Sequence, residues 1–298
     1  MSTAVRTDTG VRALLRDFVA LPKPRIISLL LVTTIAPMFV AGRPSWDLVL
    51  VVFVGGYLMA GGANAVNMYL DRDIDDRMAR TRLRPLPSGR MQPREVLTFG
   101  LVLATAATFL LARFANVLTA ALALVGFYAY VFLYTRWLKR STPQNIVIGG
   151  AAGAVPPLVG WAAVTGRVDL MAVYLFVIVF YWTPPHFWAL ALNKQRDYGK
   201  AGVPMAPLVW GEAETKRQML WYTAILIALT VLPWTMGALG GVYLASALVL
   251  DALLVRGVWR VVRAADYVAP AWSVYKYSLL YLALLFTAMA VDRMLAVI

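Results

Sequence analysis

Three polar side chains stand four residues apart where the second long apolar stretch of the chain ends. In the segment NMYLDRDIDDR, Asn67, Asp71 and Asp75 share this spacing, which puts them on one face of a helix. Carboxylates one turn apart repel each other by roughly 0.2–0.5 kcal/mol, and a bound cation would reverse that effect. Mg2+ prefers oxygen ligands and is commonly held by one or two carboxylates together with substrate phosphates. The spacing therefore predicts a site for Mg2+ and phosphate, with Asp71 and Asp75 as ligands that are solvated at the end of a helix.

A second pair of amide and carboxylate side chains lies further along the chain. Asn193 and Asp197 are four residues apart in NKQRDYGKAGVPM, directly after the sixth apolar stretch. Segments that follow the second and the sixth stretch emerge on the same side of a membrane. A second Mg2+ at this pair would hold the other side of the same diphosphate, and two metal ions would together stabilise the leaving group.

Basic residues surround both motifs. Arg80 and Arg84 follow the first motif in a segment rich in arginine, proline and glycine, which is typical of a shaped loop rather than a helix. Lys139, Arg140 and Lys194 follow the fourth and sixth stretches and would reach the same pocket if those ends converge. Guanidinium groups bind phosphate oxygens well. A solvated cytoplasmic loop is also rich in basic residues, and the arginine run taken alone favours that second interpretation.

The only histidine lies at membrane depth. His186 follows Pro184 and Pro185 in YWTPPHFW, and the two prolines are expected to kink the sixth stretch. An ionisable residue at this depth is a functional candidate, because a neutral imidazole can ligate iron or accept a proton. A hydrogen-bonded interior histidine without a function is an equal alternative. Tyr134 is a candidate for lining the substrate pocket, although most aromatic residues of such a chain serve as interface anchors or packing.

Nine apolar stretches must position these residues. Each is close to the 20 residues that a helix needs to cross about 30 Å of hydrocarbon. The pattern predicts an all-α polytopic membrane protein with spans at 26–45, 48–70, 94–112, 116–135, 143–163, 169–192, 218–237, 239–255 and 274–295.

Basic residues are distributed unevenly between the two sides of these spans. The amino-terminal segment and every second loop hold 24 Lys and Arg, and the other side holds four. Since cytoplasmic loops retain basic residues, the amino terminus is predicted to be cytoplasmic and the carboxyl terminus to lie outside. Residues 1–25 form a basic cytoplasmic segment in which Arg6, Arg12 and Arg16 alternate with apolar residues. This segment favours an amphipathic helix on the membrane surface over an organelle transit peptide.

Composition narrows the function classes. Hydrophobic residues make up 61% of the chain and charged residues 14%, which is outside the range of soluble domains. The absence of cysteine excludes a thiolate nucleophile, a disulfide framework and a sulfur metal site. The net charge of +13 is concentrated on one side of the membrane, so it predicts membrane orientation and no nucleic-acid partner.

Both aspartate motifs, in a chain of nine spans, resemble the UbiA superfamily of intramembrane prenyltransferases. Further segments resemble the branch of that superfamily that farnesylates haem, and the similarity covers roughly residues 22–210. These segments are KPRIISLLLVTT, DRDIDDRMARTRLRPLPSGR, YTRWLKRSTPQNIVIGGAAGAVPPLVGW, WTPPHFWALAL and DYGKAGVPMAP. The resemblance implies one transmembrane prenyltransferase domain over residues 26–298.

The resemblance also implies an activity. A farnesyl group would be transferred from farnesyl diphosphate to a vinyl group of haem B, and water would be added to give haem O for haem-copper oxidases. Mg2+ is the implied cofactor. The lipid bilayer and other proteins of haem A synthesis or oxidase assembly are the implied partners. The bacterial cytoplasmic (inner) membrane is the expected location, with the active site on the cytoplasmic side.

Residue roles follow from motif position within the family. Asn67, Asp71, Asp75 and Asp197 would bind Mg-diphosphate, and Asn193 completes the catalytic motifs. Basic residues would contact phosphate, and His186 would lie on the haem side. The basic set is Arg80, Arg84, Lys139, Arg140 and Lys194. Asn193 stands where many members of the superfamily carry an aspartate, which weakens the second metal site.

Two other functions remain open at this point. The same diphosphate site would serve an enzyme that prenylates an aromatic acceptor such as 4-hydroxybenzoate or a chlorophyllide. A membrane transporter could use the aspartates as ligands of a coupling ion. Transporter sites usually lie near the bilayer midplane, whereas these motifs lie at the ends of spans.

Overall fold

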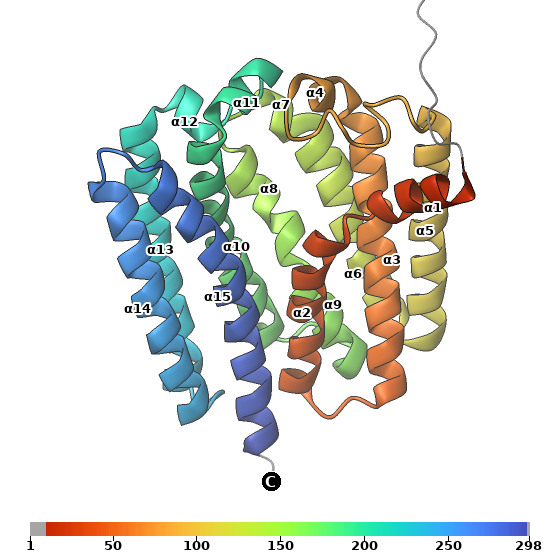
Figure 1. Cartoon of the computed structure of the whole chain (residues 1–298). Coiled ribbons are helices and arrows are strands. Elements are labelled where there is room, and N and C mark those ends of the chain that lie inside the picture. Colours follow the sequence, from red (N-terminus) through yellow and green to blue (C-terminus); the bar gives the residue numbers. More distant parts are fainter. Residues whose placement is uncertain (1–9, 297–298) are drawn as a thin grey trace, which may run out of the picture.

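The structure, a computed structural model, describes residues 10–296. Within that range the regular elements are all helices. Nine helical segments of these residues are long and apolar enough to cross a membrane, and Figure 1 shows them side by side in one bundle. The prediction of an all-α protein with nine spans is therefore confirmed.

Of the nine spans in the described residues, seven are single helices and two are built from more than one element. The single helices are α2 (Pro24–Ala41), α3 (Trp46–Leu70), α5 (Pro93–Phe114), α10 (Leu170–Asn193), α13 (Glu212–Thr235), α14 (Gly241–Arg263) and α15 (Val268–Leu295). The composite spans are α6 (Val117–Tyr128) continued by η1 (Ala129–Leu138) and α7 (Lys139–Ser141), and α8 (Asn145–Ala154) continued by α9 (Pro156–Thr165).

The last three spans extend further at the end nearer the motifs than their apolar patterns indicate. Helix α13 begins at Glu212, α14 ends at Arg263 and α15 begins at Val268, each about two turns beyond the predicted limit. A hydropathy pattern stops where charged side chains begin. The helical backbone continues past that point because long charged side chains can lie at the membrane surface while their stems stay apolar.

Two contacts between helices depend on glycine. The Cβ of an alanine at Gly160 in α9 would lie 1.8 Å from the carbonyl oxygen of Thr34 in α2. One at Gly62 in α3 would lie 2.6 Å from the carbonyl oxygen of Gly100 in α5. Backbones therefore touch at both places, as small residues allow in membrane bundles.

The short helices α4 (Arg72–Arg77), α11 (Gln195–Ala201) and α12 (Ala206–Val209) gather at one end of the bundle (Figure 1). Together with the segment 78–92 they form what we call the rim. Helices α4 and α11 contact each other, and buried Ile74 and Tyr198 share one apolar cluster. Both aspartate motifs therefore lie at the same end of the molecule, as predicted.

The predicted amino-terminal helix is present as α1 (Val11–Ala20), while residues 1–9, including Arg6, lie outside the described residues. Helix α1 is fixed to the bundle by two contacts. The rings of Phe18 and Phe99 are 5.1 Å apart, and Arg90 Nε lies 2.9 Å from Asp17 Oδ2. Its predicted place on the membrane surface stays a prediction.

Candidate active site

Asp71 stands where α3 ends and α4 begins. Its backbone has φ −89° and ψ 6°, yet the helical hydrogen-bond pattern continues across it. The Asp71 N–H donates to the Asn67 carbonyl oxygen at 2.9 Å, and the Asp75 N–H donates to the Asp71 carbonyl oxygen at 2.7 Å. Asn67, Asp71 and Asp75 therefore stay one turn apart, as their spacing predicts.

The two carboxylates of this motif are buried. Asp71 and Asp75 are each 1% exposed, so the expectation that they are solvated is wrong. The segment that follows α4 folds back over them, and Thr81 Oγ1 donates to the Asp75 carbonyl oxygen at 2.7 Å. Met78 and Leu86 of the same segment are themselves buried. The predicted basic loop is thus a cover over the motif rather than a loop in solvent.

Each buried carboxylate is paired with a cation. Lys139 Nζ lies 2.6 Å from Asp71 Oδ2, and Arg84 Nη1 lies 2.6 Å from Asp75 Oδ2. Asn67 Nδ2 also donates to Asp71 Oδ2, at 2.8 Å. Buried charges are tolerated only when they are paired in this way. The structure therefore brings together five of the residues that the sequence nominated.

The other oxygen of Asp71 lacks a hydrogen bond. Oδ1 is buried without a hydrogen-bond partner, and its nearest charged group is Arg140 Nη2 at 3.7 Å. Buried polar atoms are normally satisfied, so this oxygen is free to accept a cation. In the described part of the chain no three His, Cys, Asp or Glu side chains converge as a metal cluster. The donor set fits an ion that takes part of its coordination from a phosphate ligand.

Lys23 belongs to this site, although the sequence motifs did not identify it. Its Nζ donates to Asn67 Oδ1 at 3.0 Å, and its backbone takes the left-handed conformation with φ 58°. Burial, followed by the charge of Arg84, lowers the pKa of Lys23 to about 7. One sequence signal for Lys23 was available. The residue directly precedes a proline at the start of the first span, on the same side of the membrane as the motifs.

Thr135 is a second residue that the sequence did not reveal. It lies in η1, a ten-residue π-helix in which the chain winds more widely than in an α-helix. Thr135 Oγ1 donates to the Tyr130 carbonyl oxygen five residues earlier at 2.8 Å. The same hydroxyl accepts from Asn67 Nδ2 at 3.0 Å. The π-helix therefore fixes the amide that links Lys23 to Asp71.

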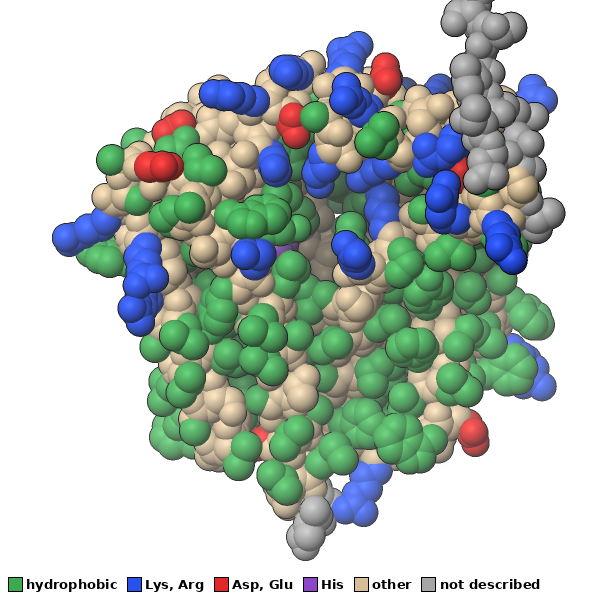
Figure 2. Space-filling view, viewed as in Figure 1, with side chains coloured by type: hydrophobic (Ala, Val, Ile, Leu, Met, Phe, Trp, Pro, Cys, Tyr) green, Lys and Arg blue, Asp and Glu red, His purple; other side chains and the backbone are tan. Residues whose placement is uncertain are grey.

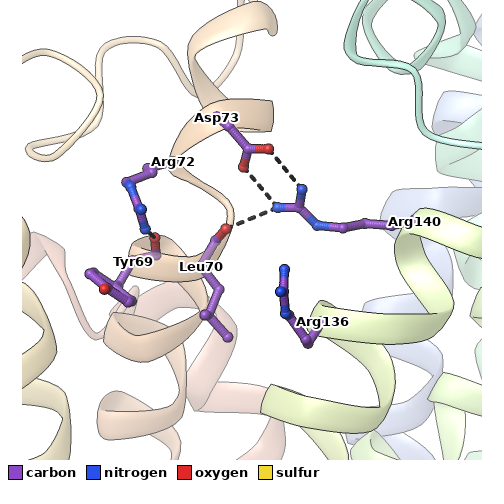
Figure 3. A pocket seen from close by; sticks show the side chains of 6 residues that line it. All are labelled: Tyr69, Leu70, Arg72, Asp73, Arg136 and Arg140. Carbon is purple, nitrogen blue, oxygen red and sulfur yellow. Dashed lines mark hydrogen bonds and ion pairs between the residues drawn. The ribbon is translucent and has the colours of Figure 1, made fainter.

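Arg140 points toward the outer side of the motif. It donates to both oxygens of Asp73, at 2.7 and 2.8 Å, and to the Leu70 carbonyl oxygen at 2.9 Å. Figure 3 shows these contacts beside Arg136, at a surface pocket of about 430 Å3. The hydrogen bond from Arg140 lowers the pKa of Asp73 to about 2. Contact between Arg140 and phosphate stays a prediction.

The second motif lies across the rim from the first. Asp197 is half-buried on α11, and it makes no hydrogen bond or ion pair with the described residues. Asn193 Nδ2 donates to the Val268 carbonyl oxygen at 3.0 Å, and Lys194 Nζ lies 5.6 Å from the centre of the Trp272 ring. Asn193 and Lys194 are thus directed toward α15. Arg80 is exposed on residues 78–92, which we call the covering segment because it folds over the first motif.

Tyr134 lies where the two motifs meet. It is half-buried, packs against the apolar cluster that joins α4 to α11, and stacks on Tyr130 with ring centres 5.8 Å apart. The Cβ of an alanine at Gly149 would lie 2.4 Å from Tyr134 Cδ2, so that glycine gives the ring its space. The predicted place of Tyr134 in a substrate pocket stays a prediction.

His186 is 4% exposed and lies between aromatic rings. Its ring stacks on Trp182 at 4.4 Å and on Tyr275 at 4.8 Å. His186 Nδ1 lies 2.7 Å from Ser278 Oγ, which donates its single proton to the Tyr275 carbonyl oxygen at 2.9 Å. Nδ1 must then be the donor to Ser278. The lone pair of the neutral ring is left on Nε2, which has no hydrogen-bond partner among the described residues.

A hollow opens on the face of the molecule that carries α2 and α15. Figure 2 shows it below the rim, with Lys and Arg side chains around it and the purple of the one histidine at its edge. The view is that of Figure 1, in which α2 and α15 flank this region. Basic side chains and the histidine therefore lie around one hollow of the bundle (Figure 2).

Fold and site together define a polytopic helical membrane protein with buried, ion-paired carboxylates at one rim. The chain belongs to the UbiA prenyltransferase family, whose model matches residues 29–286. A relative from Chloroflexus aurantiacus named protoheme IX farnesyltransferase is 54% identical over 99% of this chain and 50% of its own length. One of the same name from Symbiobacterium thermophilum is 53% identical over 93% of this chain and 94% of its own length. The chain spans about half the length of the first relatives that it matches.

Solved structures share the fold. A structure of digeranylgeranylglyceryl phosphate synthase covers 94% of this chain and 98% of its own, with a TM-score of 0.76 at 20% identity. A UbiA homologue from Archaeoglobus fulgidus, bound to DMAPP and Mg2+, covers 92% of this chain and 99% of its own, with a TM-score of 0.64 at 15% identity. The predicted UbiA-type bundle is confirmed by these matches.

Proposed function

We propose that this chain transfers the farnesyl group of farnesyl diphosphate to a vinyl group of haem B, with addition of water, to give haem O. The family supports prenyl transfer, and the name shared by relatives at 53–54% identity supports these two substrates. The observation that carries the proposal is the pair of buried carboxylates at the rim, each held against a cation. In such a site the carboxylates can exchange their cationic side chains for a metal ion, and the cationic side chains can then bind the diphosphate.

Mg2+ is the proposed cofactor, supported by the Mg2+ bound to the Archaeoglobus homologue. Asp71 and Asp75 would hold it, with Asn67 and Asp197 as further ligands, and Asp71 Oδ1, which has no hydrogen-bond partner, fits this role. When bound, Mg2+ offsets the negative charge of the diphosphate and improves it as a leaving group.

The cations of the site would bind the phosphate oxygens. Lys139 and Arg84 are already at 2.6 Å from the carboxylates, and a diphosphate with its metal would supply new partners for both sets of charges. Lys23 would bind from the side of α2, and Arg80 and Lys194 from the covering segment and α11. Charge complementarity of this kind stabilises the anion that forms as the prenyl group leaves.

The transfer step balances with water as the only further reactant. The bond between farnesyl C1 and the diphosphate oxygen breaks, and its electron pair leaves with the diphosphate. The vinyl electrons of haem then form a carbon–carbon bond to C1, water adds to the cation left beside the macrocycle, and a proton is released. Tyr130 and Tyr134 offer aromatic faces for the allylic cation, an attraction of about 0.5–2 kcal/mol per ring.

His186 is the residue we place on the haem side. Its Nε2 carries the lone pair because Nδ1 is engaged by Ser278. A neutral imidazole nitrogen can ligate haem iron or accept a proton. The stacked rings of Trp182 and Tyr275 fix its plane, and flat aromatic surfaces suit a macrocycle.

The wider setting of the enzyme is part of the same proposal. Residues 26–298 would act as one domain in the bacterial cytoplasmic membrane, with the rim and the amino terminus cytoplasmic and the carboxyl terminus outside. The distribution of Lys and Arg supports this orientation. Proteins of haem A synthesis or oxidase assembly would receive the product.

Turnover by the purified chain tests the proposal. Given haem B, farnesyl diphosphate and Mg2+, it should form a haem whose mass has increased by one farnesyl group and one hydroxyl group. Parallel reactions contain 4-hydroxybenzoate or a chlorophyllide in place of haem. Prenylation of those acceptors alone would overturn the haem assignment. Substrate-driven flux across liposomes without any covalent product would instead indicate a transporter.

A further inference from the structure

A second groove lies on the bundle surface between α14 and α15. It has a volume of about 480 Å3 and is lined by residues of those two helices alone, among them Leu253, Val274 and Tyr277. None of its lining residues contributes to the site at the rim. Gly257 on its floor brings the helices close together, because a Cβ there would lie 3.1 Å from Val274 Cγ2.

The groove is positively charged. Arg256 and Arg260 line it one helical turn apart, and both are exposed. No Asp or Glu lines it, and neither arginine has a hydrogen bond or ion pair from its side chain within residues 10–296. The pocket of Figure 3 differs in this respect, since the guanidinium group of Arg140 there donates hydrogen bonds to both oxygens of Asp73.

The depth of these arginines determines what can neutralise them. Arg256 lies seven residues before Arg263, the last residue of α14, which is about 10 Å along a helix. Both arginines lie in the part of α14 that continues past the apolar stretch, near the end of a candidate membrane span. Long basic side chains in the last turns of a span can reach the headgroup region, where an anionic headgroup attracts each of them by about 1 kcal/mol.

We propose that this groove binds one anionic phospholipid. Its phosphate lies between Arg256 and Arg260, and an acyl chain runs along Leu253, Val274 and Tyr277. Basic pockets between transmembrane helices favour anionic headgroups for this reason. The apolar lining distinguishes a lipid from free phosphate, because only a lipid has a chain to cover it.

Lipid binding to the purified full chain in neutral detergent tests this proposal. Native mass spectrometry compares phosphatidylglycerol with phosphatidylcholine for the wild type and for Arg256→Gln/Arg260→Gln. The wild type should hold one phosphatidylglycerol. Loss of both guanidinium groups should weaken its binding about thirtyfold, since each contributes about one kcal/mol near an anionic headgroup.

The matched control is Arg12→Gln/Arg94→Gln, which removes the same charge from exposed positions outside the groove. It should bind phosphatidylglycerol like the wild type, and the Tm of both double variants shows that they are folded. Equal binding of phosphatidylglycerol by the two double variants would overturn the proposal. So would equal binding of phosphatidylcholine by the wild type, or displacement of the lipid by inorganic phosphate at equal concentration.

Discussion

Lys139 and Arg84 form ion pairs with Asp71 and Asp75, the carboxylates that are proposed to hold a metal ion. The contacts are 2.6 Å long and the carboxylates are almost fully buried, so the charges of the site are balanced in the absence of ligand. A ligand that brings both a cation and a phosphate can exchange with these pairs without leaving any charge uncompensated. A metal or a phosphate alone would leave one set of charges without partners.

Asp71→Asn tests that exchange. It should lower prenyl transfer on the order of a hundredfold or more, because it removes charge that stabilises the reacting groups. It should also lower the Tm, since loss of one partner of a buried ion pair costs about 3 kcal/mol. Asp76→Asn is the control, because Asp76 is exposed on α4, and it should change neither value. Full turnover by Asp71→Asn would refute the metal assignment.

Lys23→Met tests the role of Lys23, a residue of the site that belongs to neither aspartate motif. Loss of the ammonium group should weaken binding of Mg-diphosphate roughly tenfold, because hydrogen bonds to a charged group contribute about 1.5–3 kcal/mol. Lys23→Arg keeps the charge and should retain most of the affinity. Titration calorimetry with inorganic diphosphate and Mg2+ measures both, and unchanged affinity of the methionine variant would remove Lys23 from the site.

His186→Ala should separate the two substrates. Haem binding should weaken because Nε2 is lost, whereas Mg-diphosphate binding should persist because His186 makes no contact with the rim carboxylates. Absorption spectra during titration with haem report the first, and calorimetry the second. Ser278→Ala keeps the imidazole and tests its orientation. If His186→Ala binds haem with an unchanged spectrum, the histidine is structural.

The first aspartate motif and its ionic partners Arg84 and Lys139 could be nominated from the sequence, whereas Lys23 and Thr135 could not. Spacing alone placed Asn67, Asp71 and Asp75 on one face. The bond from Lys23 to Asn67 joins residues 44 positions apart, and the bond from Asn67 to Thr135 joins residues 68 positions apart. No local pattern encodes such pairs. Burial of the aspartates likewise depends on how the covering segment folds back.

At the scale of helices, the hydropathy pattern predicted the membrane spans. The nine spans follow from the need for about 20 apolar residues in each crossing. The π-helix from Ala129 to Leu138 has no such signal, because its wider winding depends on contacts with neighbouring helices. The extension of α14 to Arg263 was missed since charged residues end an apolar pattern without ending a helix.

Gly160→Ala tests the contact between α2 and α9. A Cβ at 1.8 Å from the Thr34 carbonyl oxygen must separate the helices, and overpacking of this kind costs about 1–3 kcal/mol. The Tm in detergent should fall. Gly153→Ala is the control in the adjoining helix α8, where a Cβ meets nothing within 4 Å, and its Tm should stay level or rise. Equal values for the two variants would show that the close contact is unimportant.

Over the whole molecule, the polar and charged residues of the candidate site lie at one end. Both aspartate motifs, the covering segment and most basic residues gather at the rim, while the opposite loops hold few charges (Figure 2). The sequence predicted this polarity from loop composition. It could not predict the hollow, because that depends on which helices become neighbours.

Orientation can be measured directly because the chain contains no cysteine. Ser88→Cys places a thiol on the covering segment, and Arg167→Cys places one in a loop at the opposite end, where the side chain is 75% exposed. A membrane-impermeant thiol reagent should label Arg167→Cys in intact cells and Ser88→Cys only after permeabilisation. The reverse pattern would invert the predicted topology.

The cover over the carboxylates has a consequence for kinetics. Residues 78–92 cover Asp71 and Asp75, and the proposed function therefore has the substrate enter from the bilayer on the flank of the bundle. Moving a farnesyl chain of 15 carbons into water would cost about 12 kcal/mol at 0.8 kcal/mol per carbon, which a molecule that stays in the lipid avoids. The substrate level that sets the rate is then its mole fraction in the surrounding lipid, and added inert lipid would slow turnover at constant bulk concentration.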